Sequence, residues 1–183
     1  LASRACHRMG TGLVTVATWS DSFSPMMQKI ASETMAIEIR SEGKDYERYR
    51  QAIPTYSSVV VGPGMGLRPE GKKVVEELIA HYQGPIVLDA DALNLVSEFN
   101  LHDLLVSRRA PTVLTPHPGE MARLLGVSKE EVTGDVLKSL RKAVDRTHAV
   151  VLLKGAATLI GSPDRGIYLN HDPNPSMATA GSG

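Results

Sequence analysis

The sequence has one cysteine, few aromatic residues and no excess of charge of either sign. Because Cys6 stands alone, the chain cannot form an internal disulfide, which is typical of proteins from reducing compartments. Aromatic residues make up 4% of the chain, which argues against a site built from stacked bases or an aromatic cage. The 20 basic residues balance the 20 acidic ones, so the sequence lacks the charge signature of a protein that binds nucleic acid or an anionic membrane.

Long apolar runs are absent as well. None approaches the roughly 20 residues that a membrane-spanning helix needs, and no signal peptide opens the chain, so we expect a cytoplasmic protein. A length of 183 residues suits one domain with a sizeable core. Cys6 lies on the apolar side of a predicted helix in "LASRACHRMG" and is expected to be a small core residue.

Short segments rich in Val, Ile and Leu recur along the chain and predict strands. Most are continuously apolar, which is typical of parallel strands covered on both faces. The predicted strands are residues 13–18, 35–39, 58–62, 85–90, 112–116, 150–155 and 158–162. Segment 158–162 and "GIYLN", joined by "PDR", have the pattern of a hairpin.

Helical patterns lie between these strands. Residues 69–84 carry an apolar stripe, with Pro69 suited to the first turn and Gly84 placed to stop the helix. "SKEE" at 128–131 is a capping-box pattern, and Asp135 is suited to start another helix. The alternation predicts one α/β domain with a mostly parallel central sheet and helices on both faces.

In such sheets ligands bind where strands end and helices begin, and four of these junctions carry unusual residues. The first, "VVVGPGMGLRP", has glycines at 62, 64 and 66 that let the backbone approach a ligand. One alternative is a Rossmann dinucleotide loop with Asp89 as its acidic residue, but Leu67 occupies the place of the third glycine. Another alternative is a glycine turn that binds nothing.

The second junction, "VLDADALN", places Asp89 and Asp91 at the end of a predicted strand. A carboxylate there can face a ligand or a hydrated Mg²⁺. For Asp91 we favour a structural role as the cap of the short helix that follows, and we leave the role of Asp89 open.

The third junction, "TVLTPHPGEMARLLG", is the most distinctive stretch. Pro116 and Pro118 restrict the backbone around His117, and Pro118 can open a helix that carries Glu120 in its first turn. An imidazole at a helix N-terminus favours its neutral form, which can both donate and accept hydrogen bonds. We favour a functional His117 over a structural one, whereas Glu120 also fits a simple interaction with the helix dipole.

The fourth junction, "VVLLKGAATLIG", ends a strand with Lys154. Its amine can meet a phosphate, and the turn through Gly155 to Thr158 can meet a purine or ribose. The alternative is a lysine that extends to solvent at the sheet edge.

Together these segments resemble the NAD(P)H-hydrate dehydratases, which repair the hydrated forms of NADH and NADPH. The resemblance runs along the whole chain, through "GTGLVTVAT", "VVVGPGMG", "VLDADALN", "LTPHPGEMARLLG", "VVLLKGAATLI" and "NPSMATAGSG". It implies a ribokinase-like fold and, in many bacterial members, an epimerase domain in the same polypeptide. It also implies a lyase that uses ADP or ATP to phosphorylate the ring hydroxyl, which then leaves as phosphate.

The resemblance also assigns residues to the two ligands. Gly64, Gly66 and His117 correspond to contacts with the hydrated dinucleotide, and Glu120 to an acidic residue that organises magnesium and phosphate indirectly. The ADP or ATP falls to six residues: Lys154, Gly155, Ala156, Ala157, Thr158 and Gly183.

In this family an aspartate that accepts the proton of the attacking hydroxyl follows "GSG", directly after Gly183. The resemblance therefore implies a domain truncated at both ends, with little turnover by itself. We also expect residues 174–183 to be poorly ordered, because "AGSG" has no side chains to pack and glycines are costly to order. Two alternatives stay open: a ribokinase-like kinase of a vitamin precursor, and a nucleotide-binding fragment without catalysis. We expect small-molecule partners, neither nucleic acid nor a membrane, and allow for a homo-oligomer.

Overall fold

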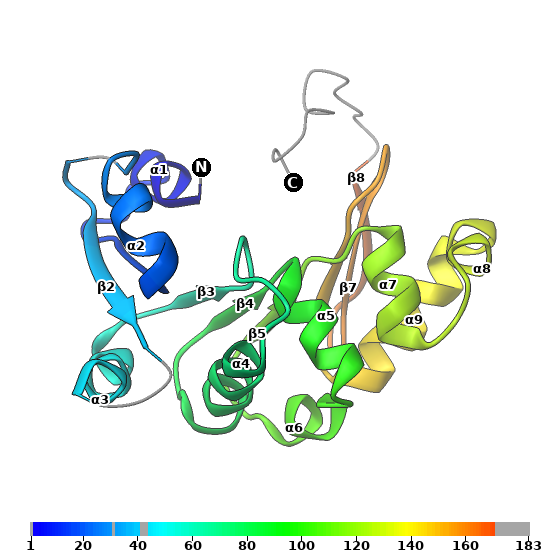
Figure 1. Cartoon of the computed structure of the whole chain (residues 1–183). Coiled ribbons are helices and arrows are strands. Elements are labelled where there is room, and N and C mark those ends of the chain that lie inside the picture. Colours follow the sequence, from blue (N-terminus) through cyan, green and yellow to red (C-terminus); the bar gives the residue numbers. More distant parts are fainter. Residues whose placement is uncertain (1, 31, 41–43, 171–183) are drawn as a thin grey trace. The chain divides into compact units, whose positions relative to one another are not determined.

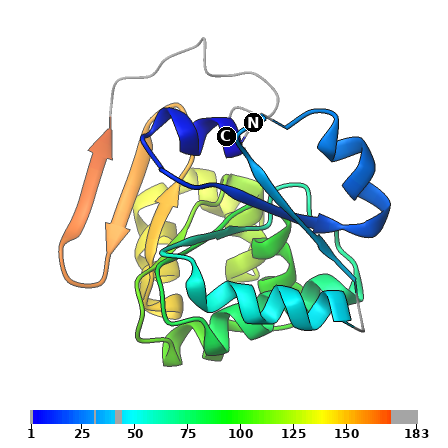
Figure 2. The same ribbon diagram turned by 90° about the vertical axis from the view of Figure 1, so that its left-hand side faces the viewer.

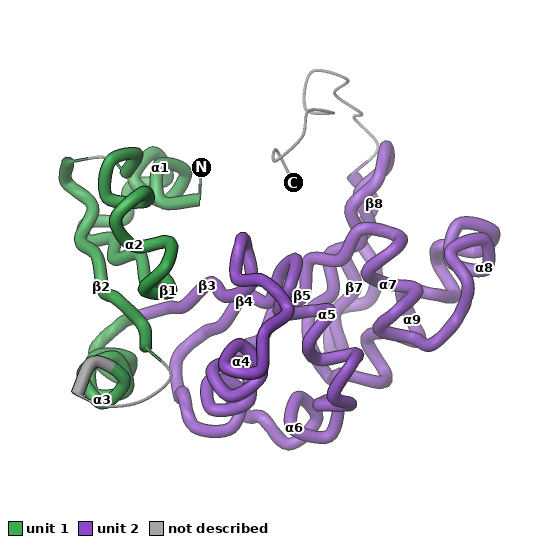
Figure 3. The backbone as a smooth tube through the Cα atoms, in the orientation of Figure 1, with its two compact units in different colours: residues 1–56 green, residues 57–183 purple. Residues whose placement is uncertain are grey.

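The computed structural model describes residues 2–30, 32–40 and 44–170. The chain divides into two compact units, Leu1–Tyr56 and Ser57–Gly183 (Figure 3). No helix within the described ranges is both long and apolar enough to cross a membrane.

The first unit pairs two short strands with small helices. Its elements in chain order are α1 (Ala2–Arg8), β1 (Thr15–Trp19), α2 (Ser20–Met27), β2 (Met35–Ile39), α3 (Lys44–Ala52) and the 3₁₀ helix η1 (Ile53–Thr55). Strands β1 and β2 are parallel, and α2 lies between them in the chain, as the crossover between parallel strands requires. The expectation of a core cysteine is wrong, because Cys6 is only half-buried and α1 has no buried residue among those described.

The second unit is built on a mixed sheet whose strand order follows the chain. Within the described residues it contains β3 (Val59–Val61), β4 (Ile86–Leu88), β5 (Thr112–Leu114), β6 (Val150–Leu153), β7 (Thr158–Ser162) and β8 (Gly166–Asn170), hydrogen-bonded in that order. Strands β3 to β6 are parallel, whereas β7 and β8 form the antiparallel hairpin that the sequence predicts. Figure 2 shows the hairpin, in orange, at one edge of the sheet.

Helices connect the parallel strands and cover the sheet (Figure 1). They are α4 (Pro69–His81), α5 (Asp91–Glu98), α6 (His102–Ser107), α7 (Pro118–Leu125), α8 (Lys129–Gly134) and α9 (Val136–Thr147). Paired positions on one face of β4, β5 and β6, such as Leu88, Leu114 and Val151, are fully buried. Their partners on the other face, such as Val87 and Val113, are half-buried.

Two predicted helix starts are confirmed. Ser128 Oγ accepts from the Glu131 amide at 3.1 Å, and Glu131 Oε1 accepts from the Ser128 amide at 3.0 Å, which completes the capping box of α8. Asp135 Oδ1 accepts from the Lys138 amide at 2.9 Å and so caps α9.

The predicted stop of α4 at Gly84 is wrong. The helix ends at His81, and the backbone of Tyr82 is already extended. The Arg108 guanidinium satisfies the freed carbonyls, because it donates to Leu78 and Ile79 at 3.4 and 3.2 Å and also contacts the carbonyls of Tyr82 and Gly84. The end of α4 is therefore stabilised by a guanidinium from a distant part of the chain and not by a glycine cap.

Candidate functional site

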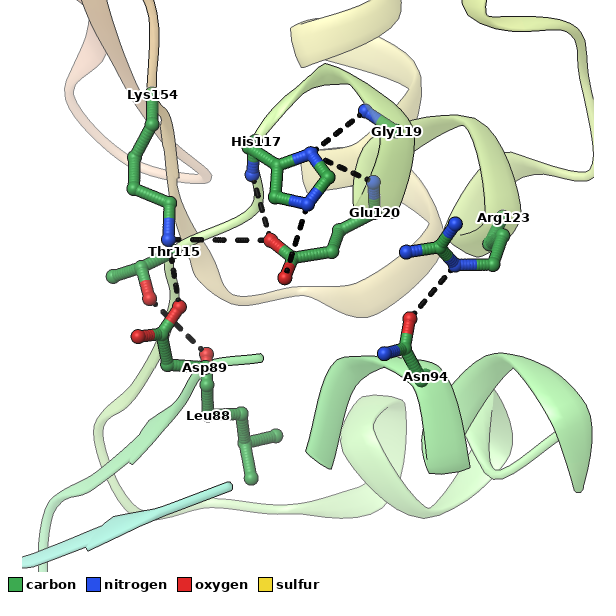
Figure 4. A network of polar contacts seen from close by, with 9 residues as sticks. All are labelled: Leu88, Asp89, Asn94, Thr115, His117, Gly119, Glu120, Arg123 and Lys154. Atoms are coloured by element: carbon green, nitrogen blue, oxygen red, sulfur yellow. Dashed lines mark hydrogen bonds and ion pairs between the residues drawn. The ribbon is translucent and has the colours of Figure 1, made fainter. Parts of the chain in front are cut away.

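Parallel pairing brings the carboxyl ends of β3, β4, β5 and β6 to one edge of the sheet, where the four unusual junctions meet. Figure 4 shows a connected network of polar side chains there, drawn from the ends of β4, β5 and β6 and the first turn of α7. At its centre Lys154 Nζ donates to Asp89 Oδ1 at 2.9 Å, and Glu120 Oε2 lies 4.0 Å from the same nitrogen. One ammonium thus stands between two carboxylates.

Lys154 is held by both its backbone and its side chain. Its amide donates to the Pro116 carbonyl at 2.8 Å, which continues the pairing of β6 with β5 beyond the last strand residue. The side chain is 21% exposed. The alternative of a lysine that simply extends to solvent is therefore wrong.

The Asp89 carboxylate is stabilised in its charged form. Burial raises its pKa, but hydrogen bonds with Lys154 and Thr115 and the charge of Lys154 outweigh burial, so that the pKa lies below its ordinary range. Asp89 is consequently an anion at neutral pH and compensates the charge of Lys154. Asp89, whose role the sequence left open, belongs to the lysine's immediate surroundings.

His117 caps α7 with its own ring. Nδ1 accepts from the amides of Gly119 and Glu120 at 3.0 and 3.4 Å, so in the neutral ring the proton lies on Nε2. Nε2 lies 3.4 Å from Glu120 Oε1, and the side chain is 51% exposed. The predicted start of the helix at Pro118 is confirmed. His117 therefore combines a structural cap with a half-exposed ring whose Nε2 lies beside Glu120.

Glu120 completes the cap and links the two sides of the network. Its Oε2 accepts from the His117 amide at 2.8 Å, and its side chain is 6% exposed. The same carboxylate thus reaches the ring of His117 through one oxygen and approaches Lys154 with the other. Glu120 therefore joins the histidine junction to the lysine junction.

The carboxylates near Lys154 can bind magnesium only if phosphates supply some of the other ligands of the ion. Asp89 and Glu120 are the nearby carboxylates, and both already have partners in the protein. Among the described residues, no group of three or more His, Cys, Asp or Glu side chains is arranged to hold a metal ion. Magnesium commonly binds through one or two carboxylates, waters and substrate phosphates, which this pair fits.

The loop after β3, residues 62–66, is called the glycine loop below. Gly62, Gly64 and Gly66 all have positive φ angles, of 119°, 69° and 77°. The Met65 amide donates to the Gly62 carbonyl at 3.0 Å, which closes a tight turn. A Cβ atom on Gly62 would lie 1.8 Å from the Asp89 carbonyl oxygen, so only glycine fits there.

The predicted cap at Asp91 is wrong. Helix α5 begins at Asp91 itself, and Ala90 is the N-cap without a side-chain cap bond in the described structure. The Asp91 carboxylate instead accepts from the Gly66 amide at 2.8 Å. The two partners are 25 residues apart, so no local sequence pattern around Asp91 predicts this hydrogen bond.

Between the two aspartates lies a strained turn that the sequence did not indicate. Ala90 has φ 48° and ψ −120°, and the Ala92 amide donates to the Asp89 carbonyl at 3.1 Å. This is type II′ geometry, in which the first central position ordinarily requires glycine. An alanine there stores backbone strain of about 1–3 kcal/mol, and such strain is concentrated at functional sites.

The remaining predicted nucleotide residues form the connection between β6 and β7. Gly155, Ala156 and Ala157 are exposed, and Thr158 is the first residue of β7. Gly183 and the segment 174–183 lie outside the described residues, so the predictions for them stay predictions.

Beside the network lies a pair that sequence reasoning missed. Arg123 on α7 donates from Nε to Asn94 Oδ1 on α5 at 2.7 Å (Figure 4). An amide is an uncharged acceptor, so this partner orients the guanidinium without neutralising it. Arg123 lies one turn after Glu120, and a helical i, i+3 spacing was the available signal.

The family model for NAD(P)H-hydrate dehydratase matches residues 1–183 of this chain. The chain belongs to that family. It is 38% identical over 189 residues to the bifunctional NAD(P)H-hydrate repair enzyme Nnr of Thermofilum pendens, and it covers 36% of that protein, with all of the chain aligned. The chain thus spans about a third of the length of this curated relative.

Solved structures support the predicted ribokinase-like fold. A ribokinase-like superfamily protein from Enterococcus faecalis matches with a TM-score of 0.80 and 25% identity, over 98% of this chain and 60% of that one. The ADP/ATP-dependent NAD(P)H-hydrate dehydratase of Bacillus subtilis, co-crystallised with ATP/Mg²⁺ and soaked with CoA, matches with a TM-score of 0.75 and 25% identity over 98% of this chain and 62% of that one. The predicted family and α/β fold class are therefore confirmed.

Proposed function

We propose that the full-length protein dehydrates hydrated NADH and NADPH at the expense of ADP or ATP. The observation that carries the proposal is the position of Glu120, whose carboxylate lies 3.4 Å from the His117 ring and 4.0 Å from Lys154. Phosphoryl transfer requires the acceptor hydroxyl and the phosphate donor to meet in one place. A single side chain joins the residue assigned to the dinucleotide and the residue assigned to the nucleotide.

On the dinucleotide side, the backbone at Gly64 and Gly66 and the Nε2–H group of His117 bind and orient the hydrated ring. A Cβ on Gly64 would meet nothing within 4 Å, so the backbone there is open to a ligand. His117 offers a donor because its Nδ1 is already occupied by backbone amides. The hydroxyl of the ring is thereby placed for attack on a phosphate.

On the nucleotide side, Lys154 and residues 155–158 hold ADP or ATP. An ammonium has three N–H donors, and the bond to Asp89 uses one of them. The others are available to phosphate oxygens, whose negative charge grows as the bond to the leaving nucleotide breaks. Lys154 therefore contributes charge neutralisation and position.

The chemistry balances in two steps. The ring hydroxyl oxygen bonds to the terminal phosphorus, the bridging P–O bond breaks, and AMP or ADP leaves while the hydroxyl proton passes to a base. The C–O bond to the new phosphate then breaks, and the neighbouring ring carbon loses a proton, which restores the ring double bond. The products are NAD(P)H, inorganic phosphate and AMP or ADP.

Four further features belong to the same proposal. Magnesium arrives with the nucleotide and neutralises phosphate charge beside Asp89 and Glu120. Both compact units form one ribokinase-like domain, and the protein acts in the cytoplasm. Gly183 completes the phosphate contacts at the end of the chain.

The test is to incubate full-length protein with hydrated NADH plus ADP, ATP or neither, and to follow the absorbance of the reduced nicotinamide. Recovery that depends on ADP or ATP supports the proposal. Lys154→Ala should reduce the recovery strongly, whereas Lys142→Ala, which removes an exposed lysine on α9, serves as the matched control. Recovery without a nucleotide, or equal rates for both variants, would contradict it.

A further inference from the structure

The turn Asp89–Ala90–Asp91–Ala92 touches the glycine loop at both of its ends. At the base of the loop, Gly62 packs so closely on the turn that an added Cβ would overlap the Asp89 carbonyl oxygen. At its far end, the Gly66 amide donates to Asp91 Oδ2 at 2.8 Å. The loop is therefore attached to one short segment twice.

We infer that Asp91 is a positioning residue for the dinucleotide: its carboxylate holds the Gly66 amide and so keeps the glycine loop in its binding conformation. The inference rests on the proposed function, in which Gly64 and Gly66 contact the hydrated ring. Glycines lose more conformational freedom than other residues when they are ordered. A bond that orders them before the ligand arrives improves affinity, because the ligand no longer has to order the loop.

The strained alanine gives the turn a second function. Asp89 lies before Ala90 and Asp91 after it, and the II′ geometry sends the two carboxylates to different partners, Lys154 and Gly66. The lysine belongs to the nucleotide side of the site, and the glycine loop to the dinucleotide side. One turn thus sets the position of both, although only Asp91 acts on the dinucleotide.

The acceptor role separates two substitutions at the same position. Asp91→Asn keeps a side-chain oxygen that can accept from Gly66, whereas Asp91→Ala removes the acceptor. In full-length protein, we expect Asp91→Ala to weaken binding of hydrated NADH about tenfold, the loss of about one hydrogen bond. ADP binding should stay within about twofold, because Lys154 keeps its own partner Asp89. Asp91→Asn should bind both ligands within about threefold of the wild type, and Asp145→Ala, on the exposed face of α9, should change neither.

Titration calorimetry with hydrated NADH and, separately, with ADP gives these affinities. Amide hydrogen exchange of Gly66 in the ligand-free protein provides a second readout, slow in the wild type and Asp91→Asn and faster in Asp91→Ala. Equal loss in the Asn and Ala variants, equal loss of both ligands in Asp91→Ala, or fast exchange of Gly66 in the wild type would overturn the inference. Failure of the wild type to bind hydrated NADH would overturn the proposed function and this inference together. Wild-type binding with unchanged binding by Asp91→Ala would overturn the inference alone.

Discussion

At the scale of single residues, His117 performs two tasks that substitution can separate. Asn is a good helix cap, so His117→Asn should keep the cap, whereas His117→Ala should lose about 1 kcal/mol of unfolding free energy. Both variants lose the Nε2–H donor, so both should bind hydrated NADH more weakly by about 1–3 kcal/mol, with a smaller effect on ADP. Urea unfolding and calorimetry measure the two effects. Equal loss of both ligands would contradict a role on the dinucleotide side.

Lys154 shows how the structure changes an expectation formed from the sequence. A lysine at a free sheet edge would be removed at little cost, but here Lys154→Met leaves the carboxylate of Asp89 without its partner. We expect the double variant Lys154→Met/Asp89→Asn to lose less unfolding free energy than the two single variants lose together. The difference should be about 1 kcal/mol for this partly exposed pair. ADP should also protect Lys154→Met less against thermal unfolding than it protects the wild type. A coupling near zero would show that the ion pair contributes nothing in solution.

At the scale of elements, two of the three positive-φ glycines of the glycine loop, Gly62 and Gly64, have different surroundings. Gly64→Ala meets no atom within 4 Å and should cost only the strain of its φ angle, about 1 kcal/mol. Gly62→Ala would place its Cβ 1.8 Å from the Asp89 carbonyl oxygen and should cost more than about 3 kcal/mol. Urea unfolding of the two variants provides the comparison. Similar stability for both would contradict the close packing of the loop on the turn.

At the scale of the whole molecule, two groups make the fold sensitive to acid. Burial lowers the pKa of His102 below its ordinary value of 6.5, with a smaller opposing effect from its bond to the Leu124 carbonyl at 2.9 Å. The unfolded chain therefore takes up a proton more readily, and stability present above about pH 6.5 is lost as the pH falls toward the folded pKa. Asp89 acts in the same direction below its ordinary value of 3.8. Urea unfolding from pH 8 to 5 should show a decline that is absent in His102→Gln, and a flat profile in the wild type would contradict this assignment.

The elements were predictable because their signals are local. Apolar runs gave every strand of the second unit within about two residues at each end, and the capping patterns at Ser128 and Asp135 gave the starts of α8 and α9. The proximity of His117, Glu120 and Lys154 was predictable from the sequence. All three lie at or soon after the ends of predicted strands, and the carboxyl ends of neighbouring parallel strands meet at one edge of a sheet.

The connections between those members were not predictable. Asp91 looked like a helix cap because the Gly66 amide is distant in the chain, and Asp89 showed no sign of its lysine partner 65 residues away. The role of Arg108 at the end of α4 was not predictable either, because Arg108 is distant in the chain from the carbonyls that it contacts. The positive φ angle of Ala90 could not be predicted, because glycine is the residue that indicates such an angle and alanine rarely adopts it.

The strand order of the second unit has a consequence for the way the chain becomes structured during synthesis. Each strand from β3 to β8 pairs with the next one along the chain, so no strand must wait for a partner made much later. Loop closure then costs little at each step, and contacts between near neighbours in sequence favour fast folding. The glycine loop and the turn that holds it are complete once β4 and the start of α5 have emerged from the ribosome. The dinucleotide side of the site can therefore take shape before the lysine of the nucleotide side has been translated.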